Sequence, residues 1–342
     1  DKQFAAIYLN ASAGDPRNGT YEFFSAGGIQ KKLRLDFDAK VYELVGKDAS
    51  KLTGSFASDE KEPGTYVFDD KNSKAAANVA RFRLAGRSSA FATSADLVVG
   101  ALSAESGASA QPFVAMARRS EQLSASALAG TYNRFSIERT DGATGSPNSA
   151  INQFRISGDG RQLELCTDHY VFSVIGCPSS GLKTYAVTVR DQFGFWRATN
   201  VADANDSEDF LAMRMNGEVI VLSAGKPSAK PSTSVFRVGL PVNSQWRDVV
   251  AYGASNDGSW NKVVVSGNAN SLSRDYLKSD GSRGKLDFSI KDMGNRSDLK
   301  DVATPSVDLE DYIGIQSTNL SLLIGAPTPA YRGLLQIDLN EQ

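Results

Sequence analysis

The chain has 342 residues, enough for two or three domains of roughly 100–200 residues each. Its 37 basic and 39 acidic side chains give a formal net charge of −2, and no basic run is longer than a pair such as Lys31-Lys32. This excludes non-specific nucleic-acid binding. No apolar stretch approaches the roughly 20 residues that a membrane-spanning helix needs, so no transmembrane segment is expected.

Taken in chain order, the predicted elements are almost all short β-strands. The strongest candidates are rich in β-branched and aromatic residues, and they cover residues 32–37, 184–190, 218–222, 235–240, 262–265, 285–290 and 334–339. Apolar positions alternate at 81–84, 154–156 and 185–189, which is typical of antiparallel sheets with one buried face. Only 74–80 and 121–128 suggest helices, both short. The predicted fold class is all-β, built from tandem antiparallel barrels or sandwiches.

Three segments of the chain show the same features in the same order. Gly19-Thr20-Tyr21, Gly130-Thr131-Tyr132 and Gly258-Ser259-Trp260 each begin a β-like run; a Lys/Gln-Leu strand follows, and two apolar runs joined by a small-residue loop close the segment. The spacing is that of whole domains rather than of solenoid repeats. We therefore predict three related modules, 1–123, 124–247 and 248–342. The alternative is coincidence, because Gly-Thr-Tyr also occurs at 64–66 and suits the start of any strand.

Residues 120–133, SEQLSASALAGTYN, combine a short helical turn with Gly-x-aromatic. This segment resembles the opening of lipocalin-type barrels, in which an aromatic after Gly plugs one end of the barrel. The resemblance covers these residues alone. Tyr replaces Trp in two of the three copies, and no second lipocalin motif is present.

Two cysteines, Cys166 and Cys177, lie in one segment and are predicted to form a disulfide that staples a hairpin. A disulfide indicates an oxidising compartment, and a chain that starts at Asp1-Lys2 without Met suits a mature exported protein. We expect a secreted protein or one of the bacterial cell envelope, in the periplasm or on the outer surface, where a lipid anchor upstream of residue 1 would hold it. The alternative is two unpaired core thiols.

Few residues suggest catalysis. His169 is the only histidine, so zinc sites with several His ligands are excluded, and a Ser-His-Asp triad would have to use it. Ser-x-x-Lys matches, for example 58–61 and 180–183, lie in loop-like sequence, and nucleotide-binding motifs are absent. No catalytic residue, resident metal or cofactor is expected.

Carboxylates cluster at 203–209 and at 307–311. Oxygen ligands suit calcium, which makes Asp203, Asp206, Glu208 and Asp209 weak candidates for a Ca²⁺ site, although the spacing is not that of an EF-hand loop. A solvated surface loop is the alternative that we favour for this segment. As a glycosidase pair, the acids would have to face each other across a cleft.

Aromatic residues cluster around 193–197. Strand alternation would place Phe193 and Phe195 on one face and Trp196 on the other. With that second face exposed, Trp196 and Arg197 would stack on a sugar or a partner surface, so these four residues are weak ligand-binding candidates. Core or interface packing is the alternative that we favour.

Together these observations favour an exported or cell-surface non-enzymatic binding protein, with a carbohydrate, a lipid or another protein as the ligand. One alternative is a carboxylate-dependent extracellular hydrolase acting on glycans or esters. Another is a structural or adhesin-like spacer of stacked modules.

Overall fold

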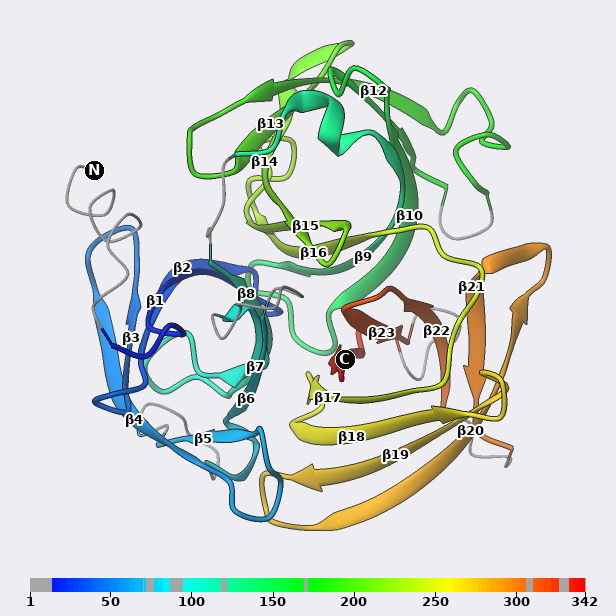
Figure 1. Cartoon of the computed structure of the whole chain (residues 1–342). Coiled ribbons are helices and arrows are strands. Elements are labelled where there is room, and N and C mark those ends of the chain that lie inside the picture. The colour runs from blue at the N-terminus through cyan, green and yellow to red at the C-terminus, as the bar shows by residue number, and fades with distance from the viewer. Residues whose placement is uncertain are drawn as a thin grey trace.

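The computed structural model describes residues 14–69, 71, 77–86, 95–117, 122–168, 172–305, 310–325 and 332–341. Within these residues the protein forms three closed antiparallel barrels of eight strands each, which appear as three lobes around a common centre (Figure 1). The all-β prediction is confirmed, and the modules are barrels rather than sandwiches.

The strands follow one another around each barrel, and the first pairs with the last. The first barrel contains β1 (Gly19–Ser25), β2 (Ile29–Asp36), β3 (Val41–Val45), β4 (Lys51–Ser58), β5 (Tyr66–Phe68), β6 (Arg81–Gly86), β7 (Ala95–Leu102) and β8 (Gln111–Met116). The middle barrel contains β9 (Gly130–Thr140), β10 (Asn148–Ile156), β11 (Gln162–Cys166), β12 (Leu182–Val189), β13 (Phe195–Asn200), β14 (Asp203–Met215), β15 (Glu218–Gly225) and β16 (Thr233–Pro241). The third contains β17 (Val249–Ser255), β18 (Ser259–Ser266), β19 (Ser271–Lys278), β20 (Arg283–Met293), β21 (Arg296–Ala303), β22 (Asp311–Gln316), β23 (Leu320–Ile324) and β24 (Leu335–Asn340).

The two predicted helices reduce to single turns of 3-10 helix within the described residues, η1 (Ala77–Val79) and η2 (Ala125–Leu128). Residues 72–76 and 118–121, where the predicted helices begin, lie outside the described part. No described helix has the length and apolar character needed to cross a membrane.

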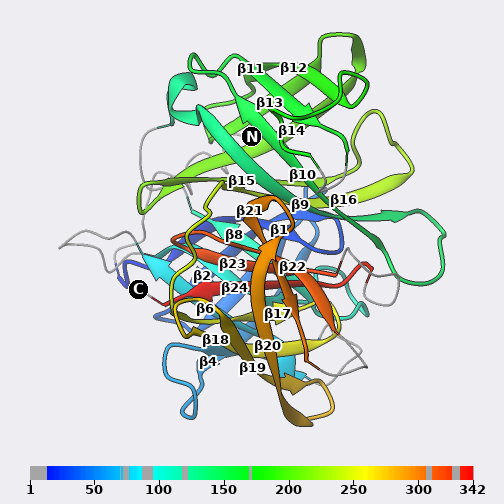
Figure 2. The ribbon, with the colours of Figure 1, turned by 90° about the vertical axis from the view of Figure 1, so that its right-hand side faces the viewer.

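Buried apolar side chains from all three barrels meet in one central core. Strands that border it are buried on both faces: every residue of β23 and β24 is buried, whereas exposed and buried positions largely alternate along β20. The central core contains Phe24 and Val99 of the first barrel, Phe135, Leu211 and Phe236 of the middle barrel, and Ile313, Leu322 and Ile337 of the third. Figure 2 shows the same arrangement from the side, with the middle barrel stacked on the other two. The three barrels thus share a core in addition to their own interiors.

The three interiors are filled differently. Aromatic rings pack inside the first barrel, including Phe23 and Phe113 with ring centroids 4.7 Å apart. The third barrel encloses a polar network in which Arg274 binds Glu310 and Gln336. The middle barrel is apolar at one end and contains a cavity at the other. The three barrels therefore differ in the side chains that fill their interiors.

The repeated motif needs one correction. Gly19 and Gly130 begin the first strands of their barrels, but Gly258-Ser259-Trp260 begins β18, the second strand of the third barrel. Hairpin geometry identifies the true counterpart of β1: both β1–β2 and β17–β18 turn over three residues that end in a glycine with positive φ, Gly28 at 76° and Gly258 at 83°. The first strand of the third barrel is therefore 249–255, which has no Gly-Thr-Tyr.

The other two features of the predicted repeat behave differently. The Lys/Gln-Leu strand is the second strand in the first barrel, the third in the middle barrel and the fourth in the third barrel. The closing pair of apolar runs forms the seventh and eighth strands in every barrel, β7–β8, β15–β16 and β23–β24. These strands are buried on both faces because they pack on a barrel interior and on the central core at once, and the polar residues among them, such as Arg237 and Asp338, are buried too.

Candidate functional site in the middle barrel

The first strand of the middle barrel has two different faces. Phe135 and Ile137 point into the central core, whereas Tyr132, Arg134 and Glu138 point into the barrel. This follows from the two-residue period of a strand. The inner face changes from an aromatic ring to charged groups along its length, so the barrel has an apolar end and a polar end.

The strand position that Arg134 occupies holds a different type of residue in each of the other two barrels. Aligning GTYEFFS of β1 with GTYNRFS of β9 places Arg134 opposite Phe23, whose ring is fully buried in the first barrel. In the third barrel the matching residue of β17 is Gly253, and a Cβ there would lie 1.7 Å from the carbonyl oxygen of Ile337. At this one position, the first barrel thus has an aromatic ring, the third has a glycine that lies close to the neighbouring strand, and the middle barrel has a cation.

The apolar end of the middle barrel is closed. The Tyr132 hydroxyl donates to the carbonyl oxygen of Leu128 at 2.8 Å, and its ring stacks on Phe154 with centroids 4.9 Å apart. Leu128 belongs to η2, and Leu123 and Ala125 pack against the same cluster. The aromatic that the lipocalin-like segment predicts as a plug therefore lies at this end of the barrel.

The polar end holds a cavity of about 330 Å³. Its walls include the exposed side chains of Asn148 and Lys183 near strand ends and of Lys230 in the loop between β15 and β16, so the cavity opens to solvent. Its deeper surface is apolar and is formed by Phe154, Leu163, Leu165, Ala198, Phe210 and Val221. An apolar floor below a few polar groups is the usual composition of a small-molecule site, and the volume lies at the small end of the typical range.

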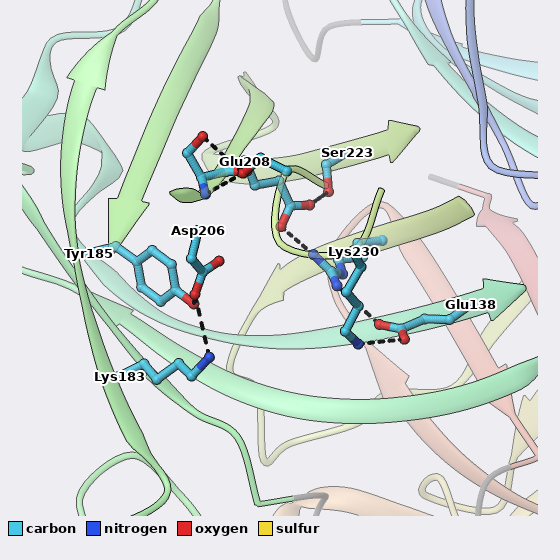
Figure 3. A network of polar contacts seen from close by, with 10 residues as sticks. Glu138, Lys183, Tyr185, Asp206, Glu208, Ser223 and Lys230 are labelled. Atoms are coloured by element: carbon cyan, nitrogen blue, oxygen red, sulfur yellow. Dashed lines mark hydrogen bonds and ion pairs between the residues drawn. The ribbon is translucent and has the colours of Figure 1, made fainter. Parts of the chain in front are cut away.

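One polar network in the cavity is built around Arg237, and Figure 3 labels its members Glu138, Glu208, Ser223 and Lys230. The Arg237 guanidinium binds Glu208 and donates to Glu138 Oε1 at 3.0 Å. Lys230 Nζ lies 2.9 Å from Glu138 Oε2, and Ser223 donates to Glu208 at 2.5 Å. Burial alone would raise the pKa of Glu138, but Lys230 and Arg237 hold it below its ordinary value. Glu138 is therefore an anion at neutral pH.

A second network lies around Asp206 (Figure 3). The carboxylate accepts from the Tyr185 hydroxyl at 3.0 Å and from Asn200 at 2.9 Å, and Lys183 lies 3.4 Å away. Burial opposes ionisation, yet these donors hold the pKa of Asp206 below its ordinary value. Burial, followed by the charge of Asp206, raises the pKa of Tyr185 above its ordinary range, so the phenol stays a neutral donor.

Arg134 differs from the other charged groups of the cavity. Its Nε is buried without an acceptor, and its guanidinium makes no hydrogen bond or ion pair with any residue that the structure describes. The side chain keeps partial exposure only because it faces the cavity. Burial, and then the like charge of Arg237, lower the pKa of Arg134 to about 10, which leaves it charged at neutral pH. Glu208 and Glu138 attract this cation only at a distance, so it faces the cavity with no carboxylate in contact with it among the described residues.

The predicted disulfide is confirmed. Cys166 ends β11 and Cys177 lies in the following loop, with 5.8 Å between their Cα atoms. This loop leaves the barrel at the polar end, where Thr167 lines the cavity. Asn152 of β10 donates to the carbonyl oxygen of Cys166 at 3.1 Å and so ties the loop to the wall. The disulfide therefore fixes one side of the cavity opening.

The predicted aromatic cluster is divided between two cores. Phe195 lies in the central core and Phe193 packs against it, while Trp196 is buried inside the middle barrel. Arg197 is exposed and pairs with Asp209 at 2.7 Å. Alternation placed the rings as predicted, but none of the three forms an exposed platform.

The carboxylates at 203–209 lie in strand β14, not in a surface loop. Alternation along the strand sends Asp206 and Glu208 into the cavity and Asp209 to the outside, so the structure does not bring the four candidate Ca²⁺ ligands together. Among the described residues, the metal-ligating side chains that converge are Cys166, Asp168 and Cys177, and the disulfide consumes both thiols.

His169 and Asp308 lie outside the described residues. Of the second carboxylate cluster, Glu310 binds Arg274 inside the third barrel. Burial and the neighbouring Asp301 raise the pKa of Asp311 to about 6.

The sequence interpretation missed most of the cavity. Asp206 and Glu208 were singled out for calcium, whereas Arg134, Tyr185 and Arg237 were not considered. A signal for one of them exists: Arg237 interrupts the otherwise apolar strand segment VFRVGL. Comparing the sequence with protein-family models and with curated proteins found no match.

Proposed function

We propose that this chain is an exported, non-enzymatic binding protein whose ligand site is the interior of the middle barrel. The observation that carries the proposal is the cavity of about 330 Å³, which combines an apolar floor with charged groups held in fixed positions. The first barrel uses the same space for packed rings and the third for a polar network. Export is inferred from the disulfide, because such bonds persist in oxidising compartments.

The ion pairs favour binding over hydrolysis. A glycosidase needs one carboxyl group that stays protonated near neutral pH. In the cavity, Lys230 and Arg237 lower the pKa of Glu138 against the effect of burial, and Arg237 binds Glu208. Hydrogen bonds from Asn200 and Tyr185, with the charge of Lys183, likewise lower the pKa of Asp206. A spacer of modules stacked end to end is disfavoured because the barrels gather around one central core.

A neutral fluorescent probe, N-phenyl-1-naphthylamine, tests the proposal. We expect a saturable rise in fluorescence with one probe per chain. Ala150 lines the cavity on β10, so Ala150→Trp should fill part of the opening and weaken binding at least tenfold. Ala143 is exposed in the loop that follows β9, so Ala143→Trp adds the same side chain outside the site and should bind like wild type.

Two results would reject the site. One is that the probe shows no saturable binding to the wild-type protein. The other is that Ala150→Trp binds as tightly as Ala143→Trp while both variants keep the wild-type unfolding temperature.

A further inference from the structure

Charge in the cavity does not balance. Four cationic side chains line it, Arg134, Lys183, Lys230 and Arg237, against three carboxylates, Glu138, Asp206 and Glu208. The cavity therefore carries one formal positive charge in excess. Water solvates Lys183 and Lys230, whose side chains are 49% and 53% exposed, but a cation deeper in the cavity is unfavourable unless an opposite charge joins it.

The excess belongs to Arg134. Arg237 binds Glu138 and Glu208, Lys230 binds Glu138, and Lys183 binds Asp206. All three carboxylates are thus engaged by other cations. A fourth anion is needed to neutralise the charge of Arg134, and the space next to this residue is the cavity itself.

We propose, building on the proposed function, that the ligand is a small monoanionic carboxylic acid whose carboxylate binds Arg134 and whose hydrocarbon part lies on the apolar floor. A planar guanidinium matches a carboxylate through paired hydrogen bonds. A dianion such as a phosphate monoester would exceed the single free charge and would lie among three carboxylates.

The floor determines the rest of the ligand. Asn152 of β10 and Gly239 of β16 pair with Arg134 on its two sides, and a Cβ at Gly239 would lie 3.1 Å from the Phe154 ring. The ring of Phe154 therefore covers the wall beside the Arg134 backbone and begins the apolar surface. A cavity of about 330 Å³ suits a short or medium-chain acid and is small for a long-chain lipid.

The test compares octanoate with 1-octanol, which share a chain and differ in charge. Both compete with bound N-phenyl-1-naphthylamine at pH 7. We expect wild type to bind octanoate at least tenfold more tightly than octanol, because a charge-assisted hydrogen bond contributes more than a neutral one.

Three arginine variants test whether Arg134 causes the preference for octanoate over octanol. Arg134→Met should remove it and leave octanol affinity within about twofold, and Arg134→Lys should keep part of it because the charge remains. Arg139 is exposed on the same strand, so Arg139→Met should behave like wild type. Arg134→Met should unfold no earlier than wild type, since it removes a partly buried charge that makes no ion pair among the described residues.

The outcomes separate the two proposals. If the neutral probe and octanol bind but octanoate is not preferred, or if Arg134→Met keeps the preference, the carboxylate inference is wrong while the binding function stands. If neither the probe nor either competitor binds, the proposed function itself fails.

Discussion

Two arginines that point into barrels show how much a single residue depends on its surroundings. Arg274 in the third barrel lies 3.0 Å from Glu310 and 3.1 Å from Gln336. Although burial opposes its charge, its neighbours Tyr312 and Glu310 raise its pKa. Arg134 in the middle barrel has no such partner among the described residues, and its pKa falls to about 10. The first arginine completes a core, whereas the second leaves a charge facing a cavity.

Asp338 provides a residue-scale prediction about pH. It is fully buried in the third barrel, Gln336 donates to one of its oxygens at 2.6 Å, and the other oxygen has no partner within the described structure. Burial raises the pKa of Asp338 to about 7. The folded protein therefore keeps a proton that the unfolded chain releases above about pH 4. This carboxyl should lower the free energy of unfolding by up to about 4 kcal/mol as the pH rises from 4 to 7.

Asp338→Asn should remove that part of the pH dependence. We expect the variant to match wild type near pH 4 and to exceed its stability near pH 8, in urea unfolding at both pH values. Asp275→Asn, at an exposed position of the same barrel, is the control for the substitution itself. Equal stability differences between Asp338→Asn and wild type at the two pH values would refute the assignment.

At the scale of elements, the sequence shows which segments form strands. It does not show which polar side chains of those strands point into a barrel. The runs at 184–190, 218–222 and 235–240 correspond to β12, β15 and β16. The segment 203–209 was expected to be a loop because it is acidic. It forms a strand in which Asp206 and Glu208 pair with Lys183 of β12 and Arg237 of β16, each one strand removed from β14 in the folded sheet. The cavity could not be predicted because its lining residues come from strands that become neighbours only in the folded barrel.

The disulfide loop carries an element-scale prediction. Cys166 and Cys177 are separated by 11 residues, and closing such a loop stabilises a protein by about 2–3 kcal/mol. The double variant Cys166→Ala/Cys177→Ala should lose that much free energy of unfolding in urea. Wild type measured with a reductant should approach the variant. A variant as stable as the oxidised protein would mean that the bond adds nothing to stability.

The whole molecule is organised around the central core. Apolar side chains of each barrel complete it, and strands such as β23 and β24 are buried on both faces. A separated barrel would expose that surface to water. The repeat in the sequence indicated three units, but it could not show that they share a core, since apolar runs buried on two faces look like ordinary buried strands.

Shared packing predicts cooperative unfolding. Calorimetry of the intact chain should show one transition rather than three. Leu322 is fully buried in the central core, so Leu322→Ala should move that whole transition to lower temperature, at a cost of about 2–5 kcal/mol. Two or three resolved transitions, with only one shifted by Leu322→Ala, would show that the barrels unfold independently.

The central claim is that a small acid binds inside the middle barrel with its carboxylate on Arg134. A crystal structure with 8-bromooctanoate tests this most directly, because bromine gives an anomalous signal at the far end of the chain. We predict one bromine peak on the apolar floor near Phe154, Leu163 and Phe210, with the carboxylate at the Arg134 guanidinium. A bromine position outside the middle barrel, or an acid held inside it with its carboxylate away from Arg134, would contradict the claim.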